Sequence, residues 1–442
     1  MSILSGWGQY PRLQAHLRKP QSSEALCALA QNGGPAIARG NGRAYGDSAI
    51  NSRCTIDMRA LNRFLQFCPD SGQLVAEAGV LLGDIIATFL PRGWFLYVTP
   101  GTKFVTLGGA VAADVHGKNH HKEGGFGAYV DWLDLLNHSG QILRCSRSEN
   151  QQLFQHTLGG MGLTGVICRV ALRLRPVSSG WIVQKRQVAR DIGQAIALFE
   201  QAQDVTYSVA WIDCLQRGAA MGRSLLMLGE HATPADLPPR ARATPFAPPK
   251  RRHLHMPITP PSWVLNRATV RAFNALYYWQ GARGPGHSLV DWDSYFYPLD
   301  AILGWNKIYG RRGFTQFQCV IPLAQAEAGL RSLLAAISAA GAGSFLAVLK
   351  RLGAQDSPLS FPMAGYTLAL DFPVTAKTLA LMQQLDTITC HYGGRIYLAK
   401  DSRISREMFH QTEPRAAPFT RYRQASGAAG AWTSAQSERL GL

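Results

Sequence analysis

Charged residues are scarce in this sequence, and acidic residues are the scarcer kind. Only 17% of the 442 residues are charged, whereas 46% are hydrophobic. This composition excludes an intrinsically disordered chain, which has fewer apolar residues. The 45 Lys and Arg residues outnumber the 28 Asp and Glu residues, which gives a formal net charge of +17. At roughly 100–200 residues per domain, the length predicts two or three structural units.

The sequence also lacks a long basic run and any nucleic-acid-binding signature. Arginine pairs occur at Arg251–Arg252 and Arg311–Arg312, but no helix-turn-helix, zinc-finger or RNA-binding motif accompanies them. We therefore expect no nucleic-acid partner. An anionic lipid surface or a phosphorylated substrate fits the excess positive charge better.

Cysteine is rare and dispersed, and no C-x-x-C motif is present. This spacing matches no zinc site, and a chain of this length does not need disulfide bonds to be stable. The sequence therefore predicts reduced, mostly buried thiols. The eight cysteines are Cys27, Cys54, Cys68, Cys145, Cys168, Cys214, Cys319 and Cys390.

Signals for export or membrane insertion are missing as well. The first residues, MSILSGWGQYPR, contain no basic start followed by an apolar stretch, so we predict no signal peptide. The longest uncharged stretch, Ser332–Leu349, has small residues and glycines in its interior. It predicts a helix, a glycine turn and a buried strand rather than a membrane span. We expect a cytoplasmic protein with peripheral contact at the inner face of a membrane.

The order of predicted elements favours two α+β units. The first ~175 residues indicate short strands separated by glycine turns, with few helices. Residues 188–204 have the spacing of an amphipathic helix. Residues 233–261 contain nine prolines, which predicts a mobile loop. Beyond this loop we expect strands near 314–321, 345–351 and 365–371 and helices near 323–340 and 374–388.

Two glycine-rich segments call for different interpretations. Gly160–Gly165 has the spacing G-x-G-x-x-G, but a helical segment precedes it and a strand follows it, which is the reverse of a Rossmann loop. Arg39–Asp47 has alternating glycines, so consecutive backbone N–H groups can form a nest for a diphosphate. A plain turn is the alternative for this second segment.

Small residues predominate in Thr106–Ala113, where a flat cofactor could lie against the backbone. Three histidines follow this segment, at His116, His120 and His121. They do not favour a metal site, because no carboxylate has facial-triad spacing and adjacent side chains point in different directions.

Taken in order along the chain, these segments resemble the vanillyl-alcohol-oxidase-type (PCMH-type) FAD oxidoreductases. Further segments resemble, more narrowly, the decaprenylphosphoryl-ribose oxidase family, whose members are the flavoprotein subunits of an epimerase that makes a polyprenyl-phosphate arabinose donor. The segments that carry the resemblance are Arg39–Asp47, Thr99–Thr102, Thr106–His121, Leu158–Ile167, Tyr295–Asp300, Gly304–Asn306, Phe314–Gln318, Pro358–Pro362 and Tyr397–Arg403.

The resemblance implies an α+β fold, with a two-subdomain PCMH-type FAD-binding domain and an inserted α+β substrate-binding cap. It places the FAD-binding domain at residues 1–178 and the cap at residues 179–395. Residues 396–442 would return to the FAD-binding domain.

The resemblance also implies noncovalent FAD, because Ala44 stands where many relatives carry the histidine that bonds the flavin. Gly101, the 106–116 segment and Val166 would line the flavin, and the 39–47 loop would hold the diphosphate. The expected cofactor-binding residues are Arg39, Gly40, Asn41, Gly42, Arg43, Ala44, Tyr45, Gly46, Asp47, Gly101, Thr106, Leu107, Gly108, Gly109, Ala113, Asp114, Val115, His116, Val166 and Tyr397.

For catalysis the resemblance implies Lys400, His116 and Tyr45, with Lys400 orienting the substrate hydroxyl or stabilising a developing alkoxide. Alternatives stay open at this stage: Lys400 paired with Asp401 at the surface, a structural His116, and Trp211 as an ordinary core residue. The expected substrate-binding residues are Gln316, Gln318, Trp211, Lys350 and Lys118.

One position departs from the family pattern. Mycobacterial members carry a cysteine, the site of covalent attack by nitroaromatic inhibitors, where this chain has Ala369. The resemblance therefore implies a protein that these inhibitors do not modify.

The activity implied is FAD-dependent oxidation of the C2 hydroxyl of a polyprenyl-phospho-β-D-ribose. The partners implied are this lipid-linked phosphosugar and a separate NAD(P)H-dependent short-chain reductase. Two alternatives stay open: an FAD-dependent sugar, alditol or aldonolactone oxidase, and a non-catalytic protein that binds anionic lipid or nucleic acid.

Overall fold

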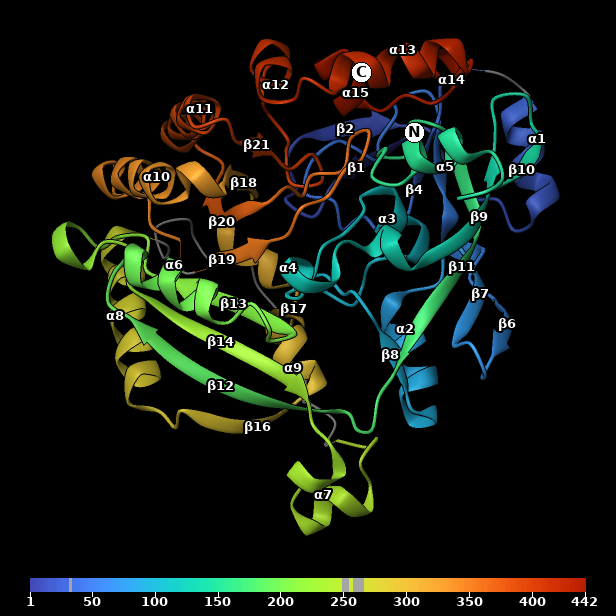
Figure 1. Cartoon of the computed structure of the whole chain (residues 1–442). Coiled ribbons are helices and arrows are strands. Elements are labelled where there is room, and N and C mark those ends of the chain that lie inside the picture. The colour runs from blue at the N-terminus through green and yellow to red at the C-terminus, as the bar shows by residue number, and fades with distance from the viewer. Residues whose placement is uncertain (32–33, 249–253, 257–265, 345) are drawn as a thin grey trace.

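The computed structural model describes residues 1–31, 34–248, 254–256, 266–344 and 346–442. Two large β-sheets, each with its own helices, make up most of the molecule (Figure 1). The first is built before residue 177 and the second after residue 180, so the chain passes from one sheet to the other over a few residues.

The first large sheet has six strands, and all of its pairings are antiparallel. Five strands follow the order β10-β9-β11-β7-β6, and β8 pairs with the far end of β11. Alternate residues of β7 and β11 are buried with α2 (Leu82–Phe89) and α3 (Leu107–Ala112) in one hydrophobic core. The strands are β6 Phe64–Cys68, β7 Gln73–Glu77, β8 Trp94–Leu96, β9 Val130–Leu136, β10 Ile142–Ser146 and β11 Val166–Pro176.

A small parallel sheet precedes it, with the order β3-β5-β4. Its strands are β3 Leu17–Arg18, β4 Ile37–Arg39 and β5 Thr55–Asp57, and β1 Ser2–Ser5 pairs separately with β2 Arg12–Ala15. The helices of this first part are short, none longer than nine residues, as its many glycine turns predict. Besides α2 and α3 they are α1 Ser23–Gln31, α4 His120–Glu123 and α5 Gln151–Thr157.

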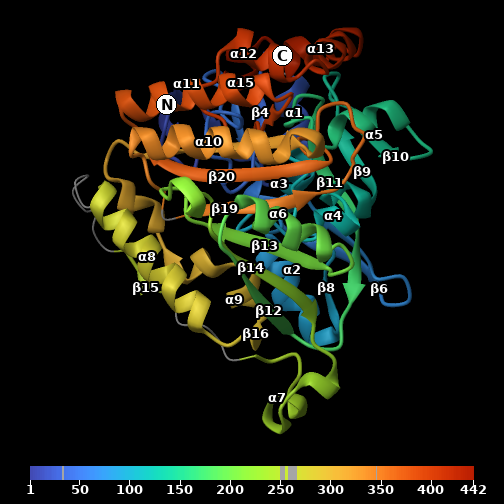
Figure 2. The same ribbon diagram turned by 60° about the vertical axis from the view of Figure 1, so that its left-hand side comes forward.

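The second large sheet has eight antiparallel strands in the order β16-β12-β14-β13-β19-β20-β18-β21. Three helices cover one of its faces and bury their apolar sides against it, as Figures 1 and 2 show: α6 Ile192–Gln201, α10 Ala326–Ala340 and α11 Ala376–His391. The strands are β12 Trp181–Ala189, β13 Tyr207–Ile212, β14 Ser224–His231, β16 His287–Asp291, β18 Phe314–Pro322, β19 Ala347–Leu352, β20 Gly365–Pro373 and β21 Arg395–Ile396.

The C-terminal helices return to the first part of the chain, and both termini lie at the same end of the molecule (Figures 1 and 2). Ala36 pairs with Trp432, and the Asn51 side chain donates a hydrogen bond to the Thr433 carbonyl. Arg439 forms ion pairs with Asp47 and Asp401. The helices are α12 Arg406–Thr412, α13 Ala416–Ala425, α14 Ala428–Ala431 and α15 Ala435–Leu440.

Several predicted boundaries need correction. The helix expected over 188–204 is shorter, because β12 continues to Ala189 and the Asp191 carboxylate caps α6 by accepting a hydrogen bond from the Gln194 N–H. The helix expected from 323 begins with a 3-10 turn, and α10 proper starts at Ala326. The strand expected from 345 starts at Ala347, and residue 345 lies outside the described residues.

The proline-rich segment 233–261 is not simply a loop. Residues 249–253 and 257–261 lie outside the described residues, but the remainder includes α7 (Pro239–Ala243) and β15 (Leu254–His255). Proline is tolerated in the first turn of a helix, so Pro239 begins α7 without losing a hydrogen bond. The region with α7 projects from the body of the molecule (Figure 1).

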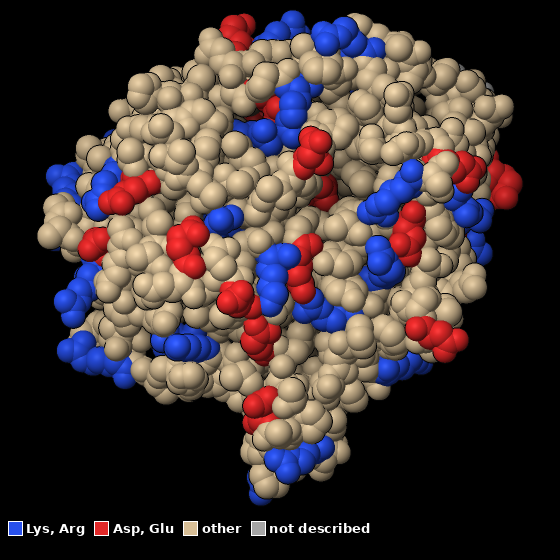
Figure 3. Space-filling view, viewed as in Figure 1, with Lys and Arg blue, Asp and Glu red and all other residues tan. Residues whose placement is uncertain are grey.

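The chain then forms α8 (Arg267–Arg283), α9 (Trp292–Phe296) and β17 (Ile302–Leu303), and β17 pairs with β15. Among the described helices, none is long and apolar enough to cross a membrane. On the face in Figure 3, Lys and Arg side chains are interspersed with Asp and Glu and form no single continuous patch.

Candidate active site

The glycine-rich loop after β4 presents backbone donors without protein partners. The amide N–H groups of residues 41–43 form no hydrogen bond with any described residue. Gly42 has φ of +63°, which is the left-handed conformation that glycine adopts readily. Unpaired N–H groups in such a turn form the concavity that binds phosphate oxygens, so the loop fits the predicted nest better than a plain turn.

Side chains from other segments hold this loop in place. A Cβ on Gly40 would lie 2.1 Å from the Thr106 hydroxyl oxygen, so the two segments approach more closely than any other residue allows. The Asn41 amide donates to the Phe104 carbonyl at 2.9 Å. The Arg39 guanidinium donates to the Ser5 carbonyl at 2.7 Å and therefore joins the start of the loop to β1.

Unlike Arg39, Arg43 packs against an aromatic ring. Its guanidinium carbon is 4.0 Å from the centre of the Trp7 ring, and its buried Nε has no hydrogen-bond partner in the structure. Burial lowers the pKa of Arg43. A buried, charged nitrogen without a partner indicates space that an anionic group would fill.

The 106–116 segment turns sharply under the site. Thr106 caps α3 through the Gly109 N–H, and Asp114 follows α3 with φ of +38°. The Asp114 carboxylate accepts hydrogen bonds from Gln355 at 2.6 Å and Ser360 at 2.7 Å. These contacts join the segment to the second part of the chain and fix the position of Val115 and His116 next to it.

The side chains of several expected cofactor residues are buried or have other partners. Val166 and Leu107 are fully buried in hydrophobic cores, so their side chains present no surface to a ligand. The Asp47 side chain is used by Arg439 at 2.9 Å. Gly101 is exposed, and an added Cβ there would meet no atom within 4 Å.

Lys350 acts electrostatically on two other half-buried lysines, Lys118 and Lys400, and the charges of the three are poorly compensated. Lys118 donates to the Tyr295 carbonyl and lies 4.1 Å from the centre of the Tyr295 ring. Lys350 forms no hydrogen bond or ion pair with a described residue, and the nitrogen of Lys400 lies 3.8 Å from the centre of the Tyr45 ring. Burial lowers the pKa of Lys118 and Lys400 to about 7 and that of Lys350 to about 8.

Lys400 interacts electrostatically with one buried carboxylate, Asp371. Burial raises the pKa of Asp371 to about 7, while the charge of Lys400 acts in the opposite direction. Asp371 in turn holds the pKa of Lys400 above the value that burial alone would give. Asp401 is committed to Arg439 and to backbone N–H groups, so the surface pairing of Lys400 with Asp401 is not what the structure shows.

His116 is buried in the same place. Its Nε2 lies 3.1 Å from the Gln318 side-chain nitrogen, and its Nδ1 has no partner in the structure. Burial lowers the pKa of His116 well below its usual value, with Lys350, His120 and Lys400 adding to the effect, so the ring is neutral at pH 7. A neutral imidazole carries one donor and one acceptor for a bound molecule.

Strand alternation places the two glutamines on one face of the second sheet, as predicted. The Gln316 amide donates to Asp371 at 2.6 Å and contacts the Tyr45 hydroxyl at 3.5 Å. In the register, Gln318 pairs with Ala369, and Lys350 pairs with Thr367. The face opposite to α6, α10 and α11 therefore carries the polar side chains of the site.

Trp211 belongs to the neighbouring part of this sheet. It lies in β13 opposite Val348, it is 6% exposed, and its ring is 4.8 Å from that of Tyr277 in α8. Tyr397 contacts the site from the other direction: it donates to the Ala113 carbonyl at 3.2 Å, and its ring lies 5.2 Å from that of His116.

The other two histidines have separate structural partners. His120 contacts Gln355 and accepts from the Gly353 N–H, and His121 contacts the Val205 carbonyl. No group of three or more His, Cys, Asp or Glu side chains able to hold a metal ion occurs among the described residues.

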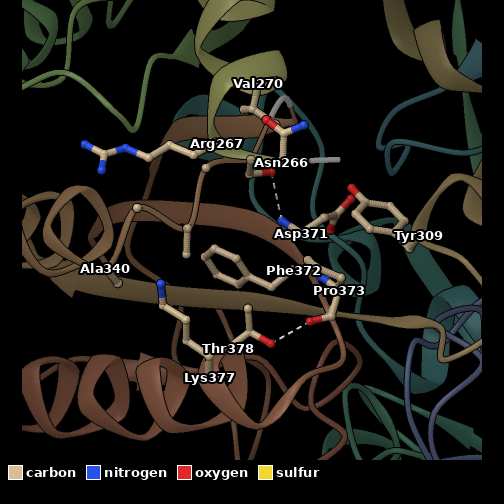
Figure 4. A pocket seen from close by; sticks show the side chains of 14 residues that line it. Asn266, Arg267, Val270, Tyr309, Ala340, Asp371, Phe372, Pro373, Lys377 and Thr378 are labelled. Atoms are coloured by element: carbon tan, nitrogen blue, oxygen red, sulfur yellow. Dashed lines mark hydrogen bonds between the residues drawn. The ribbon is translucent and has the colours of Figure 1, made fainter. Parts of the chain in front are cut away.

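Asp371 is the residue of the site that sequence reasoning missed. In the strand sequence GYTLALDFP, Asp371 lies on the same face as Thr367 and Ala369, because the three are alternate residues. A carboxylate within such an apolar strand is a signal that could have identified it. With Tyr309 it also lines a pocket of about 160 Å³ between the start of α8 and the start of α11 (Figure 4).

These residues fit an FAD: the 41–43 amides would hold its diphosphate, and His116, Tyr397 and Lys400 would act at its ring system. The unpartnered nitrogens of Arg43 and His116 are the observations that support this fit. Proton transfer and stabilisation of a negative oxygen are the chemistry that amines with a pKa near 7 supply in such surroundings.

Comparisons with known proteins identify the family of this chain. Residues 18–146 match the FAD binding domain family. The chain is 34% identical to the decaprenylphosphoryl-β-D-ribose oxidase of Mycolicibacterium smegmatis, over 99% of this chain and 97% of that protein. It is also 34% identical to an uncharacterized protein in the mprA 5′ region of Streptomyces coelicolor, over 82% of this chain and 100% of that protein. Bovine L-gulonolactone oxidase is 33% identical over 31% of each chain.

Proposed function

Because the chain belongs to the decaprenylphosphoryl-ribose oxidase family of FAD-dependent oxidoreductases, we propose that it oxidises the C2 hydroxyl of a polyprenyl-phospho-β-D-ribose to the 2-keto sugar. FAD is its cofactor. A separate NAD(P)H-dependent short-chain reductase would complete the epimerisation to an arabinose donor for cell-envelope glycan synthesis. The second sheet, with residues 179–395, would serve as the substrate-binding cap.

The observation that carries the proposal is the cluster formed by Lys118, Lys350 and Lys400. Of these three amines only Lys400 is influenced by a carboxylate, Asp371, and Lys350 has no hydrogen bond or ion pair with a described residue. An uncompensated ammonium group in surroundings of low polarity is costly unless an anion binds there. The 40–43 loop would hold the diphosphate of FAD. The anion that the three lysines would bind is therefore the phosphate of the substrate.

Removal of a hydride from the C2–H bond is the chemistry supplied by FAD when it is bound. The hydroxyl proton leaves in the same oxidation, and the Lys400 amine accepts it, because burial lowers the pKa of Lys400 to about 7. The Tyr45 ring holds Lys400 in place, and Gln316 links Tyr45 to Asp371. Neutral His116, held by Gln318, orients the sugar.

The alternative within the same fold is an oxidase of free sugars, alditols or aldonolactones, as bovine L-gulonolactone oxidase would suggest by its name. A neutral substrate of this kind would provide no anionic group to compensate the charges of Lys118 and Lys350. The amines therefore favour the phosphorylated substrate.

The test is anaerobic visible spectroscopy of the purified holoenzyme with a short-chain prenyl-phospho-ribose, with free ribose and alditols as controls. We expect only the prenyl-phospho-ribose to bleach the oxidised flavin spectrum. Lys350→Ala should raise the concentration needed for half-maximal bleaching by about tenfold, because one charge-assisted phosphate contact is lost. Equal bleaching by free sugars would replace the proposal with the sugar-oxidase alternative.

A further inference from the structure

Helix α8 exposes large apolar side chains in a way that no other described helix does. Phe273 is 43% exposed, Leu276 54%, Tyr277 39% and Trp279 52%. The other exposed large apolar residues in the described part of the chain lie in strands, in a 3-10 turn or at Met1. Figures 1 and 2 both place α8 at the edge of the molecule, so this helix is accessible.

Helix α8 lacks the apolar inner side and the polar outer side of an ordinary surface helix. Val270 and Asn274, one turn apart, are its buried positions, whereas the outward positions carry Leu276, Trp279 and exposed alanines. A surface helix in water normally has its polar side outward and its apolar side against the core. An apolar outward side indicates that something other than water covers this helix.

The charges around this apolar side have one sign. Residues 266–285 contain no Asp or Glu, and arginines stand near both ends of α8, at Arg267, Arg271 and Arg283. The Arg283 guanidinium lies 4.5 Å from the centre of the Trp279 ring. Trp, Phe and Leu together with Arg form the composition that binds the interface of an anionic membrane, where aromatic rings lie among headgroups and arginines contact phosphates.

The position of α8 relative to the candidate site adds a second observation. Tyr277 contacts Trp211 of the second sheet, and Arg267 and Val270 line the pocket shared with Asp371 (Figure 4). A surface that lies on the bilayer at this point would bring the substrate side of the second sheet to the membrane, where a polyprenyl chain resides.

We infer that α8 docks this protein onto an anionic lipid bilayer, with Leu276 and Trp279 inserted at the headgroup level. The reason for such docking rests on the proposed function, in which the substrate is linked to a lipid. Binding to the bilayer can nevertheless be measured without the substrate. A second copy of the chain or a protein partner on the same surface are the competing occupants.

The test is cosedimentation of the holoenzyme with vesicles of phosphatidylglycerol and phosphatidylcholine in equal proportion, and with vesicles of phosphatidylcholine alone. We expect binding to the anionic vesicles that weakens with added salt. A variant with Leu276→Ser and Trp279→Ser should bind them at least about tenfold more weakly, because two inserted apolar side chains are lost. The control, with Leu65→Ser and Ile142→Ser, removes exposed apolar side chains from β6 and β10 and should bind as the wild type does.

Bound-flavin absorbance shows that each variant is folded. The inference is overturned if the wild type does not sediment with anionic vesicles, or if the α8 variant sediments as strongly as the wild type. It is also overturned if ultracentrifugation shows a dimer that the α8 substitutions dissociate while vesicle binding is absent, since α8 would then bind a second copy. Failure of the proposed function gives a different result, the absence of flavin bleaching by short-chain prenyl-phospho-ribose in a protein that still binds vesicles.

Discussion

At the scale of single residues, Lys400 is the group that we propose to accept the proton of the substrate hydroxyl. Its amine lies against the Tyr45 ring, and burial brings its pKa to about 7. An amine with this pKa exchanges protons readily at neutral pH, which an ordinary surface lysine does not.

We therefore expect Lys400→Ala to slow flavin reduction by a prenyl-phospho-ribose by about 10²–10⁴-fold, the usual contribution of a positioned acid–base group. Single-turnover spectroscopy under anaerobic conditions measures this rate. Lys185→Ala, on the exposed side of β12, is the matched control and should leave the rate unchanged. Near-normal reduction by the Lys400 variant would remove Lys400 from the catalytic role.

Asp371 sets the pH at which Lys400 works. The charged groups that act on Lys400 are Asp371, which raises its pKa, and Lys350, which lowers it. If the neutral amine is the reactive form, the rate of flavin reduction should rise with pH through about pH 7.

Replacing Asp371 with Asn removes the negative charge that favours protonated Lys400. The pKa of Lys400 then falls, so the rising limb of the pH–rate profile should move to lower pH, by about one pH unit or less for a single charge at this distance. Stopped-flow measurements across the pH range test this shift. A limb that stays in place or moves to higher pH would contradict the coupling between the two residues.

At the scale of secondary-structure elements, strand register determines which side chains enter the site. Along β18, Gln316 and Gln318 face the polar side of the sheet, whereas Cys319, the residue after Gln318, is fully buried in the core shared with α6, α10 and α11. Burial raises the pKa of Cys319 to about 12. This thiol is therefore neither accessible from the site nor reactive.

Strand register also places Ala369, the position at which the mycobacterial relatives carry a cysteine. Ala369 pairs with Gln318 on one side and Val348 on the other, in the centre of the polar face. A nitroaromatic inhibitor incubated with the wild-type holoenzyme and substrate should form no covalent adduct, because no cysteine is present there. Ala369→Cys should create one, detectable by mass spectrometry of the intact protein. An adduct on Cys319 of the wild type would show that the register argument is wrong.

At the scale of the whole molecule, the C-terminal segment stabilises the cofactor loop from a distance. Arg439, in α15, donates to Asp47 and Asp401 at 2.9 Å each, and both carboxylates are buried. Asp47 ends the 39–47 loop, and Asp401 follows Lys400. One arginine thus holds the two halves of the site together.

We expect Arg439→Gln to destabilise the fold by about 3 kcal/mol, because two buried carboxylates lose their partner. The melting temperature should fall, and gel filtration should show a loss of bound flavin. Arg421→Gln, on the exposed surface of α13, is the control and should change neither quantity. Full flavin retention in the Arg439 variant would mean that α15 is not needed to form the site.

Much of this molecule follows from local sequence. The glycines of the 39–47 loop, the alternation of Gln316 and Gln318, and the helix–turn–strand order of 332–349 each depend on neighbouring residues, and the structure agrees with them. Glycine permits the left-handed turn at position 42, and a period of two residues places alternate side chains on one face of a strand.

Other features were beyond local reasoning. The start of the helix predicted over 188–204 depends on β12, which continues to Ala189 because its last residues pair with β14. The side chain of Val166, which is predicted to line the flavin, is fully buried in a hydrophobic core, so only its backbone is left for such a contact. Only the packed sheet determines which residues keep a free surface.

The sequence by itself determined the chemistry available: the phosphate-binding loop, the amines and the amide side chains, each specified by a residue and its neighbours. The tertiary structure decided how that chemistry behaves. A pKa of about 7 for Lys400 and for Asp371 arises because segments more than 25 residues apart bury the two groups in one place. Desolvation and proximity are properties of the packed chain, and no local pattern of residues encodes them.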